Sequence, residues 1–297
     1  MTETPASGPT LLVSVNGKVV PRAEAKVSVF DASFQSGDSV WEGLRVYNGK
    51  IFRLRQHLER LAHSAAALGI SSLPHETMSL ALAEVLAANG FRDDCHIRLM
   101  LSRGERRTSG MDPRNAEGPP TLVIIPELKP VSPEPDPQKL ITASMRRPTP
   151  QFLDPSIHHS NQLNSILARL EAIRQGVDAA LMLDVNGFVA EADSANIFAV
   201  IDGVVTTPAR GSFLRGITRQ CLIDLARELN GTVEERNIAL AEIYGASEVF
   251  VCGTVCEVVP VAAIDGRDVS LHWADPPVWR RLLRAYRAMV ERETREG

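Results

Sequence analysis

The sequence predicts a two-domain α/β protein in which strands and helices occur in both domains. Its 297 residues leave room for about two domains. Five prolines lie within 126–138, and such a cluster disfavours both helix and central strand. Strand-like and helix-like patterns alternate on both sides of that cluster. We therefore expect a small α+β domain over residues 1–125, a proline-rich linker over 126–138 and a larger α/β domain over 139–297.

Composition and charge argue against several classes of protein. Hydrophobic residues make up 44% of the chain and charged residues 23%, which is the balance of an ordinary globular protein. The net charge is −4 and the arginines are scattered, so no nucleic-acid footprint is visible. The N-terminus lacks a basic region followed by an apolar core, and no later stretch approaches the ~20 apolar residues of a membrane span. We expect a cytoplasmic protein that binds neither nucleic acid nor membrane.

The cysteines indicate neither a disulfide framework nor a metal site. The sequence has four of them and no C-x-x-C pair, and Cys252 and Cys256 have no histidine nearby. We expect reduced, structural thiols and no bound metal.

The N-terminal domain begins with strand patterns. We expect strands at 11–15 and 19–20 joined by an Asn16-Gly17 turn, and further strands at 26–30, 44–47, 51–54, 96–102 and 121–125. Between them, apolar residues at helical spacing predict helices over 57–68 and 75–88, which Gly69 and Gly90 are placed to end.

The C-terminal domain shows a similar alternation. We expect strands at 140–145, 180–183, 197–201, 204–206, 248–252 and 258–264, and helices over 218–229 and 277–293. Ser160 is a good N-cap for a further helix, which Gly176 would end. Apolar residues recur along that helix at helical spacing: Leu163, Ile166, Leu167, Leu170 and Ile173.

Two glycine-containing turns could bind an anion. Gly216 precedes the helix predicted at 218–229, where unpaired N–H groups and the helix dipole favour a phosphate and Thr218 can add a hydroxyl. The second turn, Gly253-Thr254-Val255, follows an apolar strand and offers N–H groups and another hydroxyl. By itself a glycine before a helix is more often only a cap. The sequence has no G-x-G-x-x-G, G-K-[ST], H-E-x-x-H or G-x-S-x-G motif, so nucleotide, zinc and elbow-serine chemistry lose their usual support.

Glu191 lies in a segment, 187–198, whose small and apolar residues suggest burial. A buried carboxylate needs a partner, whereas a lone acidic residue is usually solvated. From these residues alone both interpretations remain open.

The region from Glu191 to Arg219 resembles the signature of the class IV aminotransferases. This pyridoxal-phosphate fold type IV family includes branched-chain aminotransferases, D-amino-acid aminotransferases and aminodeoxychorismate lyases. The matching positions are Glu191, Asn196-Ile197-Phe198, Thr207 and Leu214-x-Gly216-Ile217-x-Arg219, whereas Asp193 departs where the family usually has a small residue. Further blocks resemble the family in order at 27–31, 37–45, 57–61 and 253–260, so the resemblance covers nearly the whole chain.

The resemblance implies a class IV aminotransferase-like fold with its active site in the cleft between domains. It also implies a homodimer that acts on an amino acid or keto acid through pyridoxal phosphate. Glu191 would pair with the pyridine nitrogen, which lets the ring accept electrons from the substrate α-carbon. The other implied cofactor-binding residues are Asn196 and Leu214, with Arg60, Ile217, Thr218 and Thr254 at the phosphate. The implied substrate-binding residues are Phe34, Ser36, Trp41 and Val255, with Arg98 and Arg103 as guanidinium groups suited to a carboxylate.

The chain departs from the family at the catalytic lysine. That lysine normally lies three or four residues before the asparagine that corresponds to Asn161, where this sequence has His158 and Ile157. No lysine follows residue 139; the lysines of the chain are Lys18, Lys26, Lys50, Lys129 and Lys139.

The missing lysine limits the chemistry that the site can perform. A lysine both holds the cofactor covalently and shuttles a proton at the substrate α-carbon, and imidazole, with a usual pKa near 6.5, can do only the second. We therefore expect a noncovalently held cofactor with His158 as proton carrier, and His159 as the second candidate. Two alternatives stay open: the same fold with altered chemistry that does not need the cofactor, and a non-catalytic ligand-binding relative.

Overall fold

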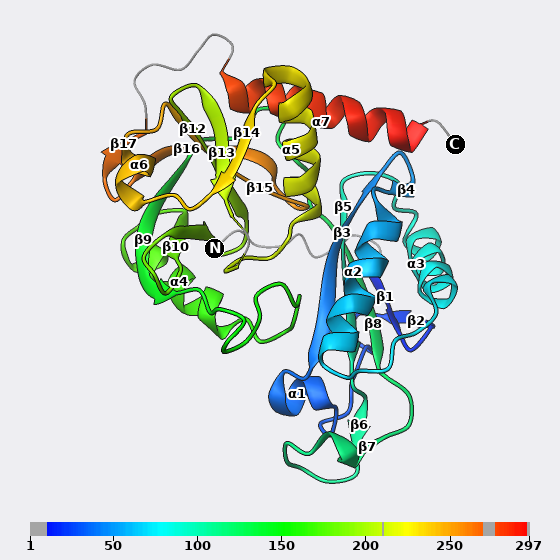
Figure 1. Cartoon of the computed structure of the whole chain (residues 1–297). Helices are drawn as coiled ribbons and strands as arrows, with labels where there is room; N and C mark the ends of the chain where they lie inside the picture. Colours follow the sequence, from blue (N-terminus) through cyan, green and yellow to red (C-terminus); the bar gives the residue numbers. More distant parts are fainter. Residues whose placement is uncertain (1–10, 210, 270–276, 296–297) are drawn as a thin grey trace. The chain divides into compact units, whose positions relative to one another are not determined.

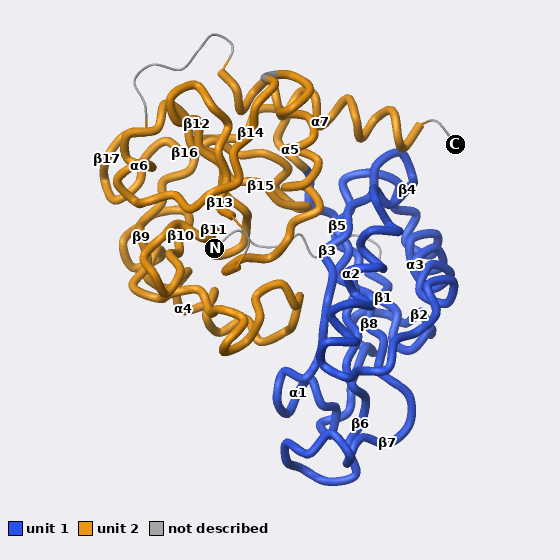
Figure 2. The backbone as a smooth tube through the Cα atoms, viewed as in Figure 1, with its two compact units in different colours: residues 1–130 blue, residues 131–297 orange. Residues whose placement is uncertain are grey.

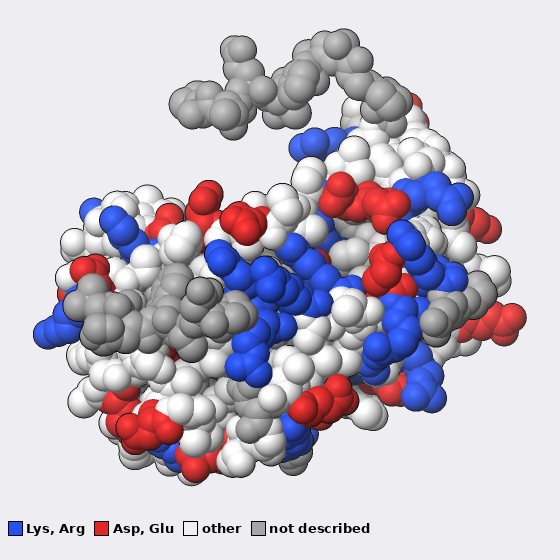
Figure 3. All heavy atoms as spheres, turned by 90° about the horizontal axis from the view of Figure 1, so that it is seen from above, with Lys and Arg blue, Asp and Glu red and all other residues white. Residues whose placement is uncertain are grey.

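The structure, a computed structural model, describes residues 11–209, 211–269 and 277–295. The chain divides into two compact units, residues 1–130 and 131–297 (Figure 2). The division falls inside the proline-rich segment 126–138. The face shown in Figure 3 carries both basic and acidic side chains, in line with the 32 basic and 36 acidic residues of the chain.

Unit 1 is an antiparallel sheet covered by two helices. The six strands are ordered β2-β1-β8-β5-β3-β4, and α2 packs on β3 while α3 packs on β1 and β8 (Figure 1). The strands are β1 (Leu12–Val15), β2 (Lys18–Pro21), β3 (Ser39–Tyr47), β4 (Lys50–Ile51), β5 (Cys95–Ser102) and β8 (Leu122–Leu128). The helices are α1 (Ala32–Ser36), α2 (Leu54–Ala67) and α3 (His75–Asn89), and β6 (Glu105–Arg106), η1 (Pro113–Asn115) and β7 (Ala116–Glu117) form a small excursion.

Unit 2 is built on a mixed sheet ordered β11-β10-β9-β16-β15-β12-β13-β14, with β17 beside β16. Helix α4 packs on β9 and β10, whereas α5 and α7 pack on each other and on β15 (Figure 1). The strands are β9 (Gln138–Arg146), β10 (Ala179–Leu183), β11 (Val189–Ala192), β12 (Asn196–Ile201), β13 (Val204–Pro208), β14 (Val233–Arg236), β15 (Glu248–Gly253), β16 (Glu257–Ile264) and β17 (Arg267–Asp268). The helices are α4 (Leu163–Arg174), α5 (Ile217–Asn230), α6 (Leu240–Tyr244) and α7 (Val278–Arg295).

Two of the expected strands differ in the structure: the prediction of a strand at 26–30 is wrong, and the strand expected at 51–54 is shorter. Residues 26–30 form no strand, and Val29 and Phe30 are exposed, because the chain turns there to place Asp31 as the N-cap of α1. Apolar alternation alone could not reveal that this segment lacks a neighbouring strand. The strand expected at 51–54 ends at Ile51, since Arg53 adopts a left-handed φ of 55° and α2 begins at Leu54.

Helix α4 begins later than expected. Its N-cap is Gln162, so Ser160 does not cap it. The proline-rich segment is also partly strand, because β8 runs to Leu128 and β9 begins at Gln138. Pro126 pairs with Ile97 of β5, while β1 pairs with the earlier residues Val123 and Ile124. Proline has no backbone N–H, so a strand tolerates it where one side of the strand does not pair with a neighbour.

Candidate functional site

Glu191 is a buried carboxylate with several partners in unit 2. It lies in β11, and its side chain is 8% exposed. Oε1 pairs with Nη2 of Arg147 at 2.7 Å, and Oε2 accepts from the Leu214 N–H and from Asn196 Nδ2, each at 3.4 Å. Burial raises the pKa of Glu191 to about 7, and the charge of Arg147 opposes that rise. Of the two interpretations of Glu191, the structure therefore supports the buried and partnered acid.

Arg147 connects this carboxylate to helix α4. Its backbone N–H donates to the Leu183 carbonyl at 2.9 Å. Its Nη1 donates to Asn164 Oδ1 at 3.0 Å and to Ser165 Oγ at 3.4 Å, in the first turn of the helix. Sequence reasoning missed Arg147, because no periodic pattern relates it to Glu191. The signal that existed was the need of a buried carboxylate for a partner, which does not identify the partner.

Asn196 ties the carboxylate to the N-terminus of α5. Its Nδ2 donates to the Leu214 carbonyl at 2.9 Å, and its Oδ1 lies so close to Gly216 that a Cβ there would be 2.0 Å away. A Cβ at that distance would force Asn196 or the start of α5 to move. Gly216 is the N-cap of α5 and provides no side-chain cap, so the first N–H groups of the helix, at Ile217 and Thr218, are available to an anion.

The second glycine turn lies at the same end of the sheet. Asn196 pairs with Cys252 of β15, and the turn of Gly253 and Thr254 follows directly. Thr254 is half-buried, and Val255 beside it is exposed. The structure therefore brings Glu191, the N-terminus of α5 and this turn together around Asn196, as three elements far apart in the sequence.

His158 and His159 lie in the loop before α4, and both are half-buried. Burial lowers the pKa of His159, and the positive charge of Arg147 lowers it further. The His159 carbonyl accepts from Gln162 Nε2 at 2.6 Å, which holds this loop to the N-cap of the helix. His159 is therefore neutral at pH 7 and lies within electrostatic reach of the ion pair between Arg147 and Glu191.

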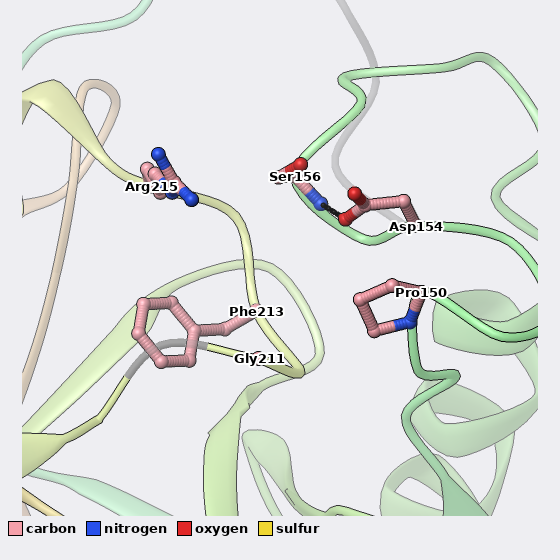
Figure 4. A pocket seen from close by; sticks show the side chains of 6 residues that line it. All are labelled: Pro150, Asp154, Ser156, Gly211, Phe213 and Arg215. Atoms are coloured by element: carbon pink, nitrogen blue, oxygen red, sulfur yellow. Dashed lines mark hydrogen bonds between the residues drawn. The ribbon is translucent and has the colours of Figure 1, made fainter.

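A pocket of about 130 Å³ lies between two loops of unit 2 (Figure 4). In Figure 4 the loop of residues 150–156 faces the loop of residues 211–215, and Asp154 accepts from the Ser156 N–H at 2.8 Å. The first loop leads to the two histidines, and the second carries Leu214. The lining residues are Pro150, Asp154, Ser156, Gly211, Phe213 and Arg215.

Arg98 and Arg60, two of the three predicted arginines of unit 1, make different kinds of contact. The Arg98 guanidinium stacks on the Trp41 ring, 4.0 Å from its centroid, and burial lowers the pKa of Arg98. Arg60 pairs in bidentate fashion with the buried Glu42, at 2.7 Å for both Nε and Nη2. His57 Nδ1 lies 2.7 Å from the same carboxylate. Glu42 thus fixes the direction of the Arg60 side chain.

The remaining predicted substrate residues lie around α1 and its neighbours. Phe34 and Ser36 are exposed on α1, and the Ser36 hydroxyl donates to the Ala32 carbonyl at 3.1 Å. Arg103 donates to Asp38 Oδ2 at 2.6 Å and also to the backbone carbonyls at the end of α2. These hydrogen bonds connect Arg103 to Asp38 and to the end of α2, so Arg103 stabilises unit 1.

A family model described as "Amino-transferase class IV" matches residues 39–264. The chain belongs to the class IV aminotransferases. Branched-chain-amino-acid aminotransferase-like protein 2 of Arabidopsis thaliana is 45% identical over 283 residues, which are 95% of this chain and 50% of that protein. The chain thus spans about half the length of this plant relative. A putative branched-chain-amino-acid aminotransferase of Methanocaldococcus jannaschii is 42% identical over 87% of this chain and 89% of its own length.

Solved structures of branched-chain aminotransferases resemble this class IV aminotransferase over nearly its whole length. The enzyme of Thermoproteus uzoniensis, solved with norvaline, has a TM-score of 0.88 at 32% identity, covering 97% of both chains. The enzyme of Thermobaculum terrenum, solved in its PLP form, has a TM-score of 0.83 at 31% identity, covering 95% of this chain and 94% of that one. The predicted fold class is confirmed. In the described part of this class IV aminotransferase, no helix is long and apolar enough to cross a membrane.

Proposed function

We propose that this class IV aminotransferase binds pyridoxal 5'-phosphate noncovalently and transfers an amino group between an amino acid and a keto acid. The observation that supports this most is the grouping around Asn196 of a buried carboxylate, an uncapped helix N-terminus and a glycine turn, in a chain with no lysine after Lys139.

The residues present fit the cofactor at its two charged ends. Glu191 would hold a proton on the pyridine nitrogen, and the first N–H groups of α5 at Ile217 and Thr218 would hold the phosphate, with Thr254 from the glycine turn. The hydrogen bond between Asn196 and Leu214 would hold Glu191 and the N-terminus of α5 at a fixed distance from each other. The resemblance assigns Arg60 to the phosphate as well. When bound, the cofactor supplies an electron-withdrawing ring.

The two histidines are the candidates for proton transfer. His158 stands at the three-residue spacing expected of the lysine, and we assign it the task of removing and returning the proton at the substrate α-carbon. His159, which is neutral beside Arg147, is the second candidate. Neither side chain can replace the covalent link that a lysine amine would form, so the cofactor would depend on Glu191 and its phosphate contacts for affinity.

We infer that the substrate is an aliphatic amino acid, because the relatives carry the name of branched-chain aminotransferases. Phe34, Ser36, Trp41 and Val255 are the proposed side-chain pocket, and the guanidinium groups of Arg98 and Arg103 are the proposed carboxylate ligands. The Arg103 guanidinium donates hydrogen bonds to Asp38 and to two backbone carbonyls of unit 1. The Arg98 guanidinium stacks on Trp41, so we favour Arg98 as the carboxylate ligand.

We also propose that the protein is a homodimer that uses the outer face of α4. The inner face of this helix packs on β9 and β10 through the buried Ala168 and Ala172. Its large apolar residues point outward and are exposed: Leu163, Ile166, Leu167, Leu170 and Ile173. A contiguous apolar patch of this kind is uncommon on a monomer. A second copy fits it, because one helix face packs on itself across a two-fold axis.

The experiment that tests the function is an absorption spectrum of the purified protein with added pyridoxal phosphate, before and after borohydride, followed by intact mass and peptide mapping. We expect a saturable band near 390 nm (about the position of the free aldehyde), which shifts only when an amino acid is added and leaves no adduct on the protein. Amino transfer from branched-chain amino acids to 2-oxoglutarate is then assayed with His158→Gln and His159→Gln. We expect the first variant to lose roughly 100-fold or more in rate.

The alternatives predict different results. Borohydride fixation on a mapped lysine would mean that the cofactor is covalently held after all, and would refute the role of His158. Cofactor binding without amino transfer would favour altered chemistry. No binding of the cofactor would favour a reaction that does not need it, or a non-catalytic ligand-binding relative.

A further inference from the structure

Helix α7 contacts both turns of the proposed phosphate site through two consecutive residues. Arg287 Nε pairs with Glu257 Oε2 at 2.8 Å, and its two terminal nitrogens donate to the Ser132 and Pro133 carbonyls at 2.7 Å. Tyr286, the preceding residue, is buried and shares a hydrogen bond with the hydroxyl of Thr218. Helix α7 therefore contacts Thr218, the second residue of α5, and Glu257, the residue that directly follows the glycine turn.

Glu257 has an unusual backbone conformation, and its ion pair with Arg287 helps to hold that conformation. It follows the turn of residues 253–256 directly and begins β16 with a left-handed φ of 57°, although it is not a glycine. Its side chain is 2% exposed, and Arg287 places a cation 2.8 Å from this buried carboxylate. An uncommon backbone conformation of this kind persists only where the surroundings impose it. Arg287 is therefore positioned to fix the shape in which the glycine turn presents Gly253 and Thr254.

Tyr286 acts on the other turn. Burial raises the pKa of its phenol, which stays neutral and can take part in a hydrogen bond as donor or acceptor. Thr218 is buried at the start of α5, so few rotamers are open to its hydroxyl once the phenol is in place. The thiols of Cys221 on α5 and Cys252 on β15 lie within electrostatic reach of Tyr286. The bond thus fixes the Thr218 side chain beside the first N–H groups of the helix.

We propose that Tyr286 and Arg287 are positioning residues of a phosphate subsite, where they hold Thr218 and the turn before Glu257 in the geometry that binds a phosphate monoester. The proposal rests on the proposed function in that the monoester is the one carried by the cofactor. Neither residue touches the ligand. Their effect is confined to the phosphate, because the contacts of Glu191 with Arg147, Asn196 and Leu214 do not involve α7.

The test compares ligands with and without the phosphate. Pyridoxal 5'-phosphate, pyridoxal and inorganic phosphate are titrated calorimetrically into the wild-type chain and into Tyr286→Phe and Arg287→Lys. We expect Tyr286→Phe to weaken pyridoxal phosphate and inorganic phosphate roughly three- to tenfold, the usual effect of one hydrogen bond, and to leave pyridoxal unchanged. Arg287→Lys keeps the charge but loses the fork that contacts Glu257 and the two carbonyls, so we expect the same pattern.

Matched controls separate positioning from loss of stability. Tyr244→Phe removes a phenol at the end of α6 that donates to Asp265 at 2.6 Å. Arg236→Lys alters an arginine that pairs with Glu234 and Glu242. Neither should change the ratio of pyridoxal phosphate affinity to pyridoxal affinity. In a Thr218→Val background, Tyr286→Phe should have no additional effect on phosphate affinity, because Tyr286 acts through Thr218.

Each other outcome has a distinct meaning. If the variants bind pyridoxal phosphate as tightly as the wild type, or lose pyridoxal equally, the positioning role is wrong and the proposed function stands. If the wild type binds inorganic phosphate in a Tyr286-dependent way but not pyridoxal phosphate, the subsite stands and the proposed function fails. If the wild type binds neither ligand, both proposals fail.

Discussion

Arg147 and Glu191 form an ion pair of 2.7 Å with side chains that are 13% and 8% exposed. The pair joins the end of β9 to β11, and Arg147 extends it to the first turn of α4 through Asn164. The acid proposed to serve the pyridine nitrogen therefore already has a fixed cation on one of its oxygens. Burial is the main cause of the pKa shifts of Glu191 and His159, and the charge of Arg147 lowers the pKa of both groups, so a single arginine acts on an acid and on a candidate base.

Removing Arg147 should destabilise unit 2, because the variant Arg147→Met leaves Glu191 buried without its cation. We expect a loss of about 3 kcal/mol in the free energy of unfolding, measured by urea denaturation at pH 9, where Glu191, with its pKa of about 7, is ionised in the wild type. The control is Arg146→Met, which alters the exposed neighbour that donates to the Ala143 carbonyl and should change stability by less than about 0.5 kcal/mol. Equal effects of the two variants would show that the pair contributes nothing specific.

Glu191 should make the stability of the protein depend on pH in a defined direction. Its pKa in the folded chain, about 7, lies above its ordinary value of 4.5, so between these values the folded state binds the proton more tightly than the unfolded state. Stability due to this group is therefore full below pH 4.5 and falls as the pH rises to 7. Relative to Glu191→Gln, the wild type should lose on the order of 2 kcal/mol across this window. Parallel curves for the two proteins would contradict the raised pKa.

Gly216 should not tolerate a methyl group. In Gly216→Ala the new Cβ would meet Asn196 Oδ1 at 2.0 Å, so either the asparagine or the start of α5 must move. We expect a loss of about 1–3 kcal/mol in thermal or urea unfolding, together with weaker binding of inorganic phosphate. Gly245→Ala is the matched control, because its φ is −93° and a Cβ would lie 3.8 Å from the nearest atoms. A fully stable Gly216→Ala protein with normal phosphate binding would show that this close approach is not required.

The outer face of α4 should control association and not folding. Replacing Ile166 and Leu170 by glutamine removes apolar groups from an exposed surface, so the folded monomer should keep its stability while the dimer dissociates at micromolar concentration. Sedimentation velocity measures the mass directly. Leu80→Gln on α3, where the leucine is 59% exposed, is the control and should leave the association unchanged. A wild-type chain that sediments as a monomer would refute the proposed homodimer.

Local patterns predicted most of the secondary structure because each of those elements carries its own periodic signal. The helix predicted at 75–88 is α3, His75–Asn89, which ends at Gly90 with a left-handed φ of 66°. The helix predicted at 218–229 is α5, one residue longer at each end. The patterns failed where a partner decides the outcome: Val29 alternates like a strand residue but has no strand beside it, and the short strands β11 and β14 gain their structure from neighbours.

The sequence by itself determined the fold class, the family blocks and the absence of any lysine after Lys139, because these depend only on residue order. The tertiary structure decided that Arg147 is the partner of Glu191, that Gly216 lies close against the Asn196 side chain, and that α4 turns its large apolar residues outward. Each of these depends on distances between groups far apart in the chain. Periodicity describes which face of an element is apolar, whereas only the packed chain shows what that face meets.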